Sequence, residues 1–270
     1  MFAGGVTGEV SDTWLSIKFE LRKHLRRKRL LIVTALAIVV PLIFYIIPRI
    51  GDVDFGGSAS SFAANTLVFL NVLIVISAAL FAGDAISSEF EKKTGLLLFP
   101  TTQSRTSIFI GKYIAALLAT FLVVSLYCVV TTLEIMVVYG VEEIPTELAK
   151  SYLLALLYTT SAVSVVYFLS SVLKRTIAST VLGFVVLMMV LPIIQGVVGL
   201  VDVEPWFIVT YSAGLITEGL GDVGFGPGGH HGFDSESFSP DLYVGIGVMI
   251  AYTLILFLSS IVVANRKSME

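Results

Sequence analysis

Long apolar runs separated by short polar connections dominate the sequence. A window of about 19 residues finds six runs long enough to cross about 30 Å of hydrocarbon as α-helices. They are rich in Leu, Val, Ile and Phe and lack the ten-residue alternation that is typical of barrel strands. We therefore expect six transmembrane helices, at residues 30–47, 62–81, 108–130, 153–172, 177–200 and 242–263.

Composition supports this pattern, because 56% of the residues are hydrophobic and only 14% are charged. The mean hydropathy of +0.93 lies far from that of a soluble domain. The fold class predicted is an all-α membrane protein, with one six-span transmembrane domain over residues 30–264. The first run follows a long, strongly basic segment and has no small-residue cleavage site after it, so we interpret it as a retained span and not as a signal peptide.

Positive charge predicts the orientation of the chain, since short loops rich in Lys and Arg stay in the cytoplasm. Fifteen of the seventeen basic residues lie in the N-terminal segment, the second-to-third connection, the fourth-to-fifth connection and the tail. The other three connections are acidic, with only Arg49 and Lys150 at their edges. We expect both termini to be cytoplasmic, with the protein in the cell membrane and a tail at residues 265–270.

The segment before the first span, residues 1–29, contains an amphipathic pattern. Trp14, Ile17, Leu21 and Leu25 recur at helical spacing beside a strip of cations. Such a helix is expected to lie in the membrane interface, with its apolar face among the headgroups. The alternative is an ordinary basic flank that only fixes the topology.

The third outer connection, residues 202–241, is the longest, and its stretch at residues 219–240 is rich in Gly, Ser and Pro, which favours a mobile segment over a packed domain. It contains the adjacent His230 and His231, which are weak candidates for metal binding because no further His or Cys completes a site. Glu134, near the outer end of the third run, is a candidate for the transport pathway, since ionisable groups at membrane depth are expensive. It is otherwise a residue close to the outer water.

No catalytic constellation is present. The sequence lacks a Gly-x-Ser-x-Gly elbow and a His-Glu-x-x-His pair, and all three histidines lie outside the runs. It also lacks a phosphate-binding loop, so we expect no catalytic residue and no cofactor in this chain. A secondary, ion-coupled transporter is a weaker alternative, because no repeated halves and no mid-membrane charged pair are visible. A non-transporting assembly protein is a third possibility.

The second-to-third connection is more elaborate than a turn requires. Ser87 or Ser88 is placed to cap a short helix whose first turn carries Glu89 and Glu91, and Gly95 is placed to end it. We expect this helix to lie along the cytoplasmic surface of the membrane with its charged side chains exposed, within a loop at residues 84–107.

The residues of this connection resemble a family motif. Asp84, Ser87, Ser88, Glu89, Glu91, Thr94, Gly95, Pro100, Ser104, Arg105, Gly111 and Lys112 stand in a pattern similar to that of the six-span, type-2 export permeases of ABC transporters. The stretch "PTTQSR" is longer than the commoner Pro-x-Ser-Arg.

The resemblance implies a permease subunit that exports its substrate as a homodimer or heterodimer of permease chains and is driven by a separate ABC ATPase that binds ATP and Mg. It implies a coupling helix that contacts the ATPase, formed by Ser88, Glu89, Phe90, Glu91, Lys92, Lys93, Thr94 and Gly95. It also implies re-entrant short helices before the last span. Lipid is an expected partner and nucleic acid is not. The scarcity of charge in the spans favours a lipid, drug or amphipathic peptide as substrate.

Overall fold

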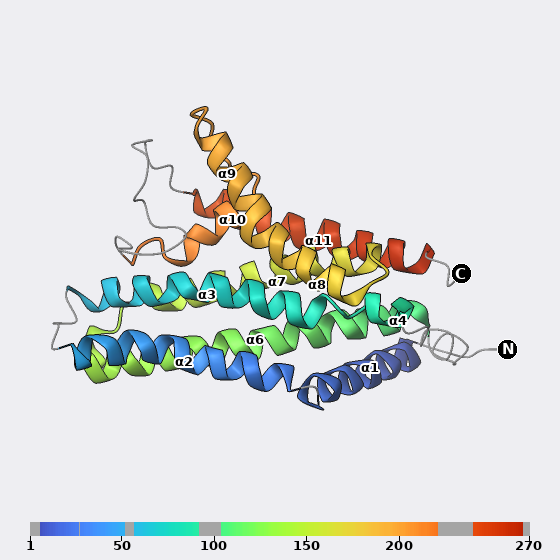
Figure 1. Cartoon of the computed structure of the whole chain (residues 1–270), viewed down its shortest axis with the longest axis horizontal. Helices are drawn as coiled ribbons and strands as arrows, with labels where there is room; N and C mark the ends of the chain where they lie inside the picture. Colours follow the sequence, from blue (N-terminus) through green and yellow to red (C-terminus); the bar gives the residue numbers. More distant parts are fainter. Residues whose placement is uncertain (1–5, 27, 52–56, 92–103, 221–239, 267–270) are drawn as a thin grey trace.

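A computed structural model describes residues 6–26, 28–51, 57–91, 104–220 and 240–266. These residues form helices joined by turns, and six helical stretches are long and apolar enough to cross a membrane, which confirms the predicted fold class. Figure 1 shows a bundle of helices that run side by side, with the N- and C-termini at the same end. An even number of spans requires that arrangement.

The bundle is built from α2 (Arg29–Ile50), α3 (Ala59–Ala82), α6 (Arg105–Val138) and α7 (Glu147–Val172). Its core contains the fully buried phenols of Tyr127, Tyr158 and Tyr167. Tyr127 donates a hydrogen bond to the carbonyl oxygen of Thr66 at 2.6 Å, and Tyr167 donates one to that of Phe109 at 2.6 Å. A buried hydroxyl needs such a partner, so these bonds fix the register of α3 on α6 and of α6 on α7.

Several helices extend beyond the predicted spans. The helix α6 has 34 residues, about 51 Å at 1.5 Å per residue, and therefore exceeds the hydrocarbon thickness. It ends at Val138, eight residues after the predicted limit, and so contains Glu134. Helix α7 begins at Glu147, six residues before the predicted span.

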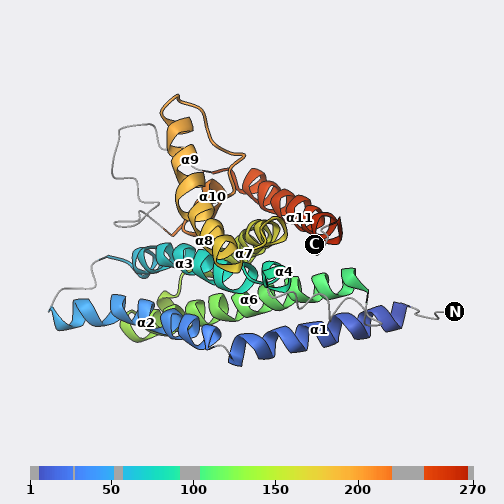
Figure 2. The same ribbon diagram turned by 45° about the vertical axis from the view of Figure 1, so that its right-hand side comes forward.

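The fifth span leaves the bundle. It consists of α8 (Thr176–Val185), a π-helical turn η2 (Val186–Val190) and α9 (Leu191–Gly199). The π turn lies just before Pro192, whose ring has no N–H and clashes with a regular helical turn, and a widened turn relieves that conflict. Figures 1 and 2 show α9 pointing away from α2, α3 and α6, and none of its residues is buried.

The last elements pack on the side of the bundle where α7 lies. They are α10 (Val209–Ser212), η3 (Ala213–Ile216) and the last span, α11 (Leu242–Arg266), whereas the short 3₁₀ turn η1 (Val141–Glu143) connects α6 to α7. Ile208, Leu215 and Ile216 are buried, so this part of the connection at residues 202–241 packs on its neighbours. Apolar side chains at this spacing bury themselves once α7 and α11 offer a surface. Most of the Gly-rich stretch at residues 219–240, on which the loop prediction rests, lies outside the described residues.

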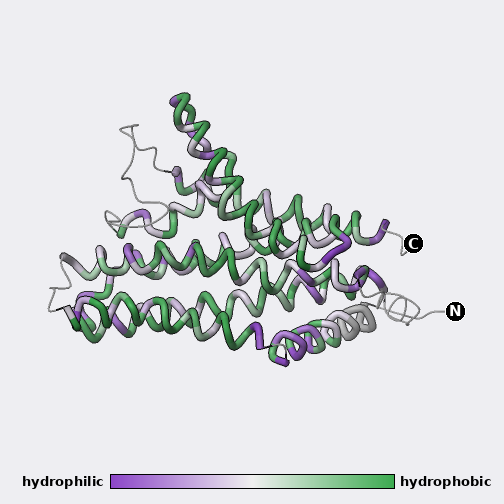
Figure 3. Tube along the Cα trace, in the orientation of Figure 1, coloured by the Kyte–Doolittle hydropathy of each residue, from purple (hydrophilic) through white to green (hydrophobic). Residues whose placement is uncertain are grey.

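Two helices complete the fold at the end of the bundle that carries the termini. They are α1 (Val6–Arg26), which packs along α6, and the one-turn helix α4 (Ser87–Glu91), which follows α3 after a four-residue turn. Between α1 and α2, Lys28 adopts the left-handed conformation with φ of 56°, which breaks the helix. Figure 3 shows hydrophilic residues gathered at this end and hydrophobic ones along the spans.

Candidate functional site at the charged end of the bundle

Lys112 lies at the centre of a buried charged cluster. Its ammonium nitrogen is 2.6 Å from Glu20 Oε1, 2.7 Å from Glu89 Oε1 and 3.1 Å from the carbonyl oxygen of Ala85. An ammonium group has three N–H donors, and these three acceptors match them. Lys112 is only 3% exposed. We call Glu20, Lys23, Glu89 and Lys112 the Lys112 junction, because it joins α1, α4 and α6.

Helix α1 reaches this position because Gly111 leaves room for it. A Cβ atom on Gly111 would lie 2.6 Å from the Cβ of Ser16 and 3.0 Å from the carbonyl oxygen of Thr13. Ser16, Ile17, Glu20 and His24 follow one another at helical spacing and are all buried. This face of α1 is therefore the one that packs on the bundle.

The junction is electrically balanced, with two carboxylates and two ammonium groups. Lys23 lies 2.9 Å from Glu20 Oε2. Burial by itself would raise the pKa of the Glu20 carboxyl, but the positive charges of Lys112 and Lys23 and the hydrogen bonds that they donate outweigh it and lower this pKa to about 2. Glu20 is thus held as a carboxylate.

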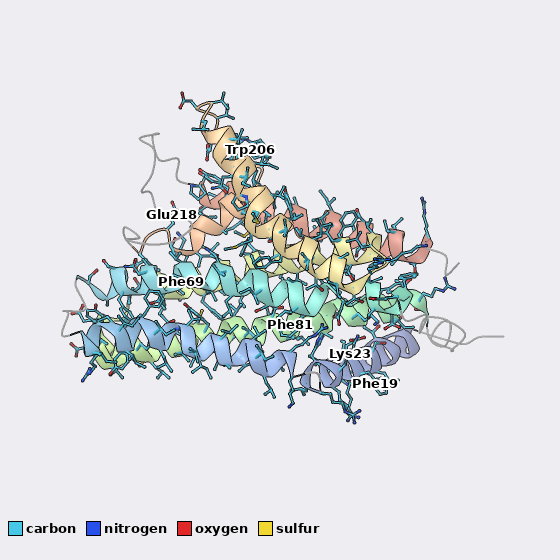
Figure 4. All side chains as sticks on the ribbon, in the orientation of Figure 1. Phe19, Lys23, Phe69, Phe81, Trp206 and Glu218 are labelled. Carbon is cyan, nitrogen blue, oxygen red and sulfur yellow. The ribbon has the colours of Figure 1, made fainter. Side chains whose placement is uncertain are left out.

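A second ion pair lies beside the junction. Arg29, the first residue of α2, places Nη1 2.7 Å from Asp84 Oδ2 and 3.1 Å from the carbonyl oxygen of Leu80. Asp84 is fully buried in the turn between α3 and α4. The ring of His24 packs edge-on against Phe81 at 5.1 Å between centroids. Burial lowers the pKa of His24, and the negative charges of Asp84 and Glu20 offset this only in part. Figure 4 shows Lys23 on α1 near the end of α3 that carries Phe81.

The turn that leads into α4 is also fixed by neutral hydrogen bonds. Ser170 of α7 accepts hydrogen bonds at 3.1 Å from the backbone N–H groups of both Ile86 and Ser87. Glu91 Oε2 accepts a hydrogen bond at 2.7 Å from the backbone N–H of Thr176, the first residue of α8. The connection after α3 therefore contacts α2, α6, α7 and α8 directly and is joined to α1 through Lys112.

These contacts correct the prediction for the coupling helix. Glu89 was expected to be exposed, but it is 7% exposed and paired with Lys112, and Ser88 is buried as well. Ser87 does not cap the helix, because its hydroxyl donates back to the carbonyl oxygen of Gly83. Phe90 is half-buried and Glu91 is exposed. Lys92, Lys93, Thr94 and Gly95 lie outside the described residues.

The apolar residues predicted on α1 divide between two environments. Trp14 is 64% exposed and Leu25 is also exposed, whereas Ile17 is buried against the bundle and Leu21 is half-buried. A shallow groove on α1 is lined by Trp14, Ile17, Lys18, Leu21, Arg22 and Leu25. Phe19, which the sequence pattern missed, is exposed and points away from the bundle in Figure 4. The membrane-interface role of α1 stays a prediction.

The other candidates lie elsewhere. His230 and His231 fall outside the described residues, and within the described ranges no group of three or more His, Cys, Asp or Glu side chains could hold a metal ion. Glu134 is buried in α6, toward the end of the bundle opposite the Lys112 junction. The sequence motif contained Lys112 and Glu89 but not Glu20, whose only signal was its place on the amphipathic segment.

Fold and site together define a polytopic α-helical membrane protein. Its second-to-third connection is joined to its N-terminal helix by the buried ion pairs of Lys112 with Glu89 and Glu20. Residues 16–191 match the family described as "ABC-2 family transporter protein". The chain therefore belongs to the ABC-2 transporter family, whose members are membrane permeases that work with an ABC ATPase. The match includes the Lys112 junction and the first four spans. No curated protein matches the chain significantly.

Proposed function

We propose that this chain is the permease subunit of an ATP-driven exporter, that two permease chains form its substrate pathway, and that a separate ATPase drives it. The observation that carries the proposal is the attachment of the α3–α4 connection to α6, α7 and α8 through Lys112, Ser170 and Glu91, and through Lys112 also to Glu20 of α1. A force applied to this connection would reach α1, α6, α7 and α8 together, because buried ion pairs and hydrogen bonds leave little freedom between them.

The proposed contact with the ATPase is the part of the connection that follows Glu89. Phe90, Glu91, Lys92, Lys93, Thr94 and Gly95 are assigned to it, and the two lysines would pair with carboxylates of the partner. Ser88 and Glu89 take a positioning role instead, because both are buried. ATP and Mg would bind in the partner.

The proposed substrate class is inferred from the spans, which expose apolar side chains and carry few charges. Exposed residues of the fifth and sixth spans include Ile193, Val197, Leu254 and Leu258. A lipid, an apolar drug or an amphipathic peptide would be compatible with such surfaces, whereas a small hydrophilic ion would need polar partners along its way. Glu134 is proposed to lie on the pathway.

A pull-down tests the proposal. The chain is co-expressed with candidate ATPases that carry a phosphate-binding loop, purified in mild detergent and assayed for stimulated ATP hydrolysis. We expect the wild type to retain one ATPase and the variant Lys92→Glu with Lys93→Glu to lose it while still inserting in the membrane. Lys150→Glu, an exposed lysine in α7 at the opposite end, is the matched control.

Two results would contradict the proposal. One is a wild-type chain that neither retains nor stimulates any ATPase. The other is transport of the cargo by the purified chain alone in vesicles.

A further inference from the structure

Glu134 is a carboxyl group on the buried face of α6, one turn before the helix ends. It is 5% exposed. On the neighbouring face of the same helix, Val129, Leu133 and Val137 are exposed, so the apolar surface that α6 offers to lipid continues past the level of Glu134. The carboxyl group of Glu134 thus lies on the face of α6 that the bundle covers.

The neighbouring helix fixes what surrounds this carboxyl group. Tyr127 of α6 bonds to Thr66 of α3, and the rings of Tyr139 and Phe62 lie 6.1 Å apart. Glu134 lies between these two contacts along the antiparallel pair, at the level of the α3 segment that contains Phe62 and the fully buried Ala63. The polar side chains of this α3 segment bond within their own helix, Asn65 to the carbonyl oxygen of Ser61 and Thr66 to that of Phe62.

Within the described residues, neither carboxylate oxygen of Glu134 has a hydrogen-bond partner, and the hydroxyl of Thr131, one turn earlier, also lacks one. An ionised carboxylate buried without a partner is among the most costly groups in a protein, and more so in a membrane.

The charged and titratable groups near this end of the bundle do not neutralise it. Helix α3 has no titratable side chain between Ala59 and Ala82. On α2, the guanidinium of Arg49 is exposed and donates to the hydroxyl of Tyr45. On α6 and α7, Tyr127 bonds to a backbone carbonyl oxygen and Tyr152 to the hydroxyl of Ser125. Of the other described titratable groups on α6, η1 and α7 toward this end, Tyr158 is buried, and the following are exposed or half-buried: Cys128, Tyr139, Glu142, Glu143, Glu147 and Lys150.

A proton can bind to this carboxylate without any further coordinating atoms. A divalent metal ion takes six or more oxygen atoms, and only three unpaired ones lie here. An organic cation would need a cavity beside a side chain that is packed against α3. A proton needs neither.

We propose that Glu134 is a proton-binding site and that the closed contact between α3 and α6 holds it as a neutral carboxylic acid. The proton comes from water and forms an O–H bond on the carboxylate. It returns to water when α3 and α6 separate and the group is hydrated. Each opening of this contact is thereby linked to the release of one proton. The inference concerns the permease chain alone and stands whether or not an ATPase partner is found.

Infrared spectroscopy of the full chain in lipid nanodiscs tests the proposal directly. At neutral pH we expect a carbonyl stretch of a protonated carboxylic acid, shifted by deuterium exchange, that is lost in Glu134→Gln and shifted in Glu134→Asp. Glu147→Gln, an exposed acid on α7, should leave it unchanged. A wild-type spectrum without this band would overturn the proposal even if the glutamine variant does not fold.

Thermal unfolding at several pH values provides a second measurement. The folded wild type holds a proton that the unfolded chain releases, so its stability should fall as the pH rises. The melting temperature of Glu134→Gln minus that of the wild type should therefore increase with pH. Parallel curves would contradict the proposal. A shift of the wild type by sodium or by ammonium at constant pH, absent in Glu134→Gln, would assign the carboxylate to a cation and would also overturn it.

Discussion

The ammonium group of Lys112 lies 2.7 Å from the carboxylate of Glu89 and, on its other side, 2.6 Å from that of Glu20. One cation on α6 thus connects the N-terminal helix to the connection that follows α3. Buried charges of this kind are costly to separate, because whichever group loses its partner stays desolvated. Substitutions at Lys112 and its partners therefore test how much these contacts stabilise this end of the bundle.

Replacing Lys112 by Met should destabilise the protein strongly. It removes the buried cation that Glu20 and Glu89 share and leaves Glu20 with Lys23. The loss of one partner of a buried pair costs about 3–5 kcal/mol. The measurement is unfolding in detergent, together with limited proteolysis of α1. Lys150→Met is the control, since Lys150 is exposed.

The triple variant Lys112→Met, Glu20→Gln and Glu89→Gln should recover part of that loss, since it removes the unpaired charges as well. If the single and triple variants melt at the same temperature, the charges of the junction do not matter to stability.

Acid should weaken the junction in a defined range. The carboxyl of Glu20 has a pKa of about 2 in the folded chain against an ordinary value of 4.5. A lowered pKa contributes stability that is complete above about pH 4.5 and is lost as the pH falls toward 2. The contribution at neutral pH is at most about 3 kcal/mol.

Melting temperatures between pH 7 and pH 2 should therefore fall more steeply for the wild type than for Glu20→Gln. The glutamine variant should already be less stable at pH 7. Glu147→Gln should follow the wild type. An identical acid profile for Glu20→Gln would show that Glu20 is not paired in the folded chain.

Gly111→Ala should loosen α1. The added methyl group would lie 2.6 Å from Ser16, closer than real Cβ atoms approach, so the helices must move apart. Overpacking of this kind costs about 1–3 kcal/mol. Gly196→Ala is the matched control, because nothing lies within 4 Å of its Cβ position and alanine favours a helix. Faster proteolysis of α1 in both variants, or in neither, would count against the contact.

The pair of Arg29 and Asp84 should show a large coupling energy. A double-mutant cycle with Arg29→Gln and Asp84→Asn isolates it, and we expect about 1–3 kcal/mol, as for residues in one buried network. Both single variants should be destabilised, Arg29→Gln more than Asp84→Asn, because Arg29→Gln takes this cation away from a fully buried carboxylate, whereas the side chain of Arg29 is partly exposed. If the effects of the two substitutions on the free energy of unfolding are additive, Arg29 and Asp84 do not form an ion pair in the folded chain.

Glu91→Ala should fray the start of α8. Its carboxylate accepts the backbone N–H of Thr176, one of the helix amides that has no partner within the helix. Loss of such a cap costs about 0.5–2 kcal/mol. Hydrogen exchange at the first turn of α8 is the measurement, and it should be faster in Glu91→Ala. Glu91→Gln keeps an acceptor oxygen, so its exchange rate should lie between those of the wild type and Glu91→Ala. Unchanged exchange in Glu91→Ala would contradict the contact.

The sequence by itself determined the spans and their number. Hydrocarbon admits only backbone whose polar groups bond internally, so an apolar run of about 20 residues has one outcome, a helix. It also indicated a helix with Trp14, Ile17, Leu21 and Leu25 on one face and the motif that contains Glu89 and Lys112, because both depend on residue types at short spacing.

Only the tertiary structure decided which charges are buried. Glu89 looks like an exposed acid in its own helix, and its burial depends on Lys112, which is 23 residues away, and on Glu20, which is 92 residues from Lys112. Glu134 likewise could not be assigned to water or to the core until α3 was placed against it. Periodicity shows which residues share a helix face, but burial and charge pairing depend on the helix that covers that face, and no local pattern contains that information.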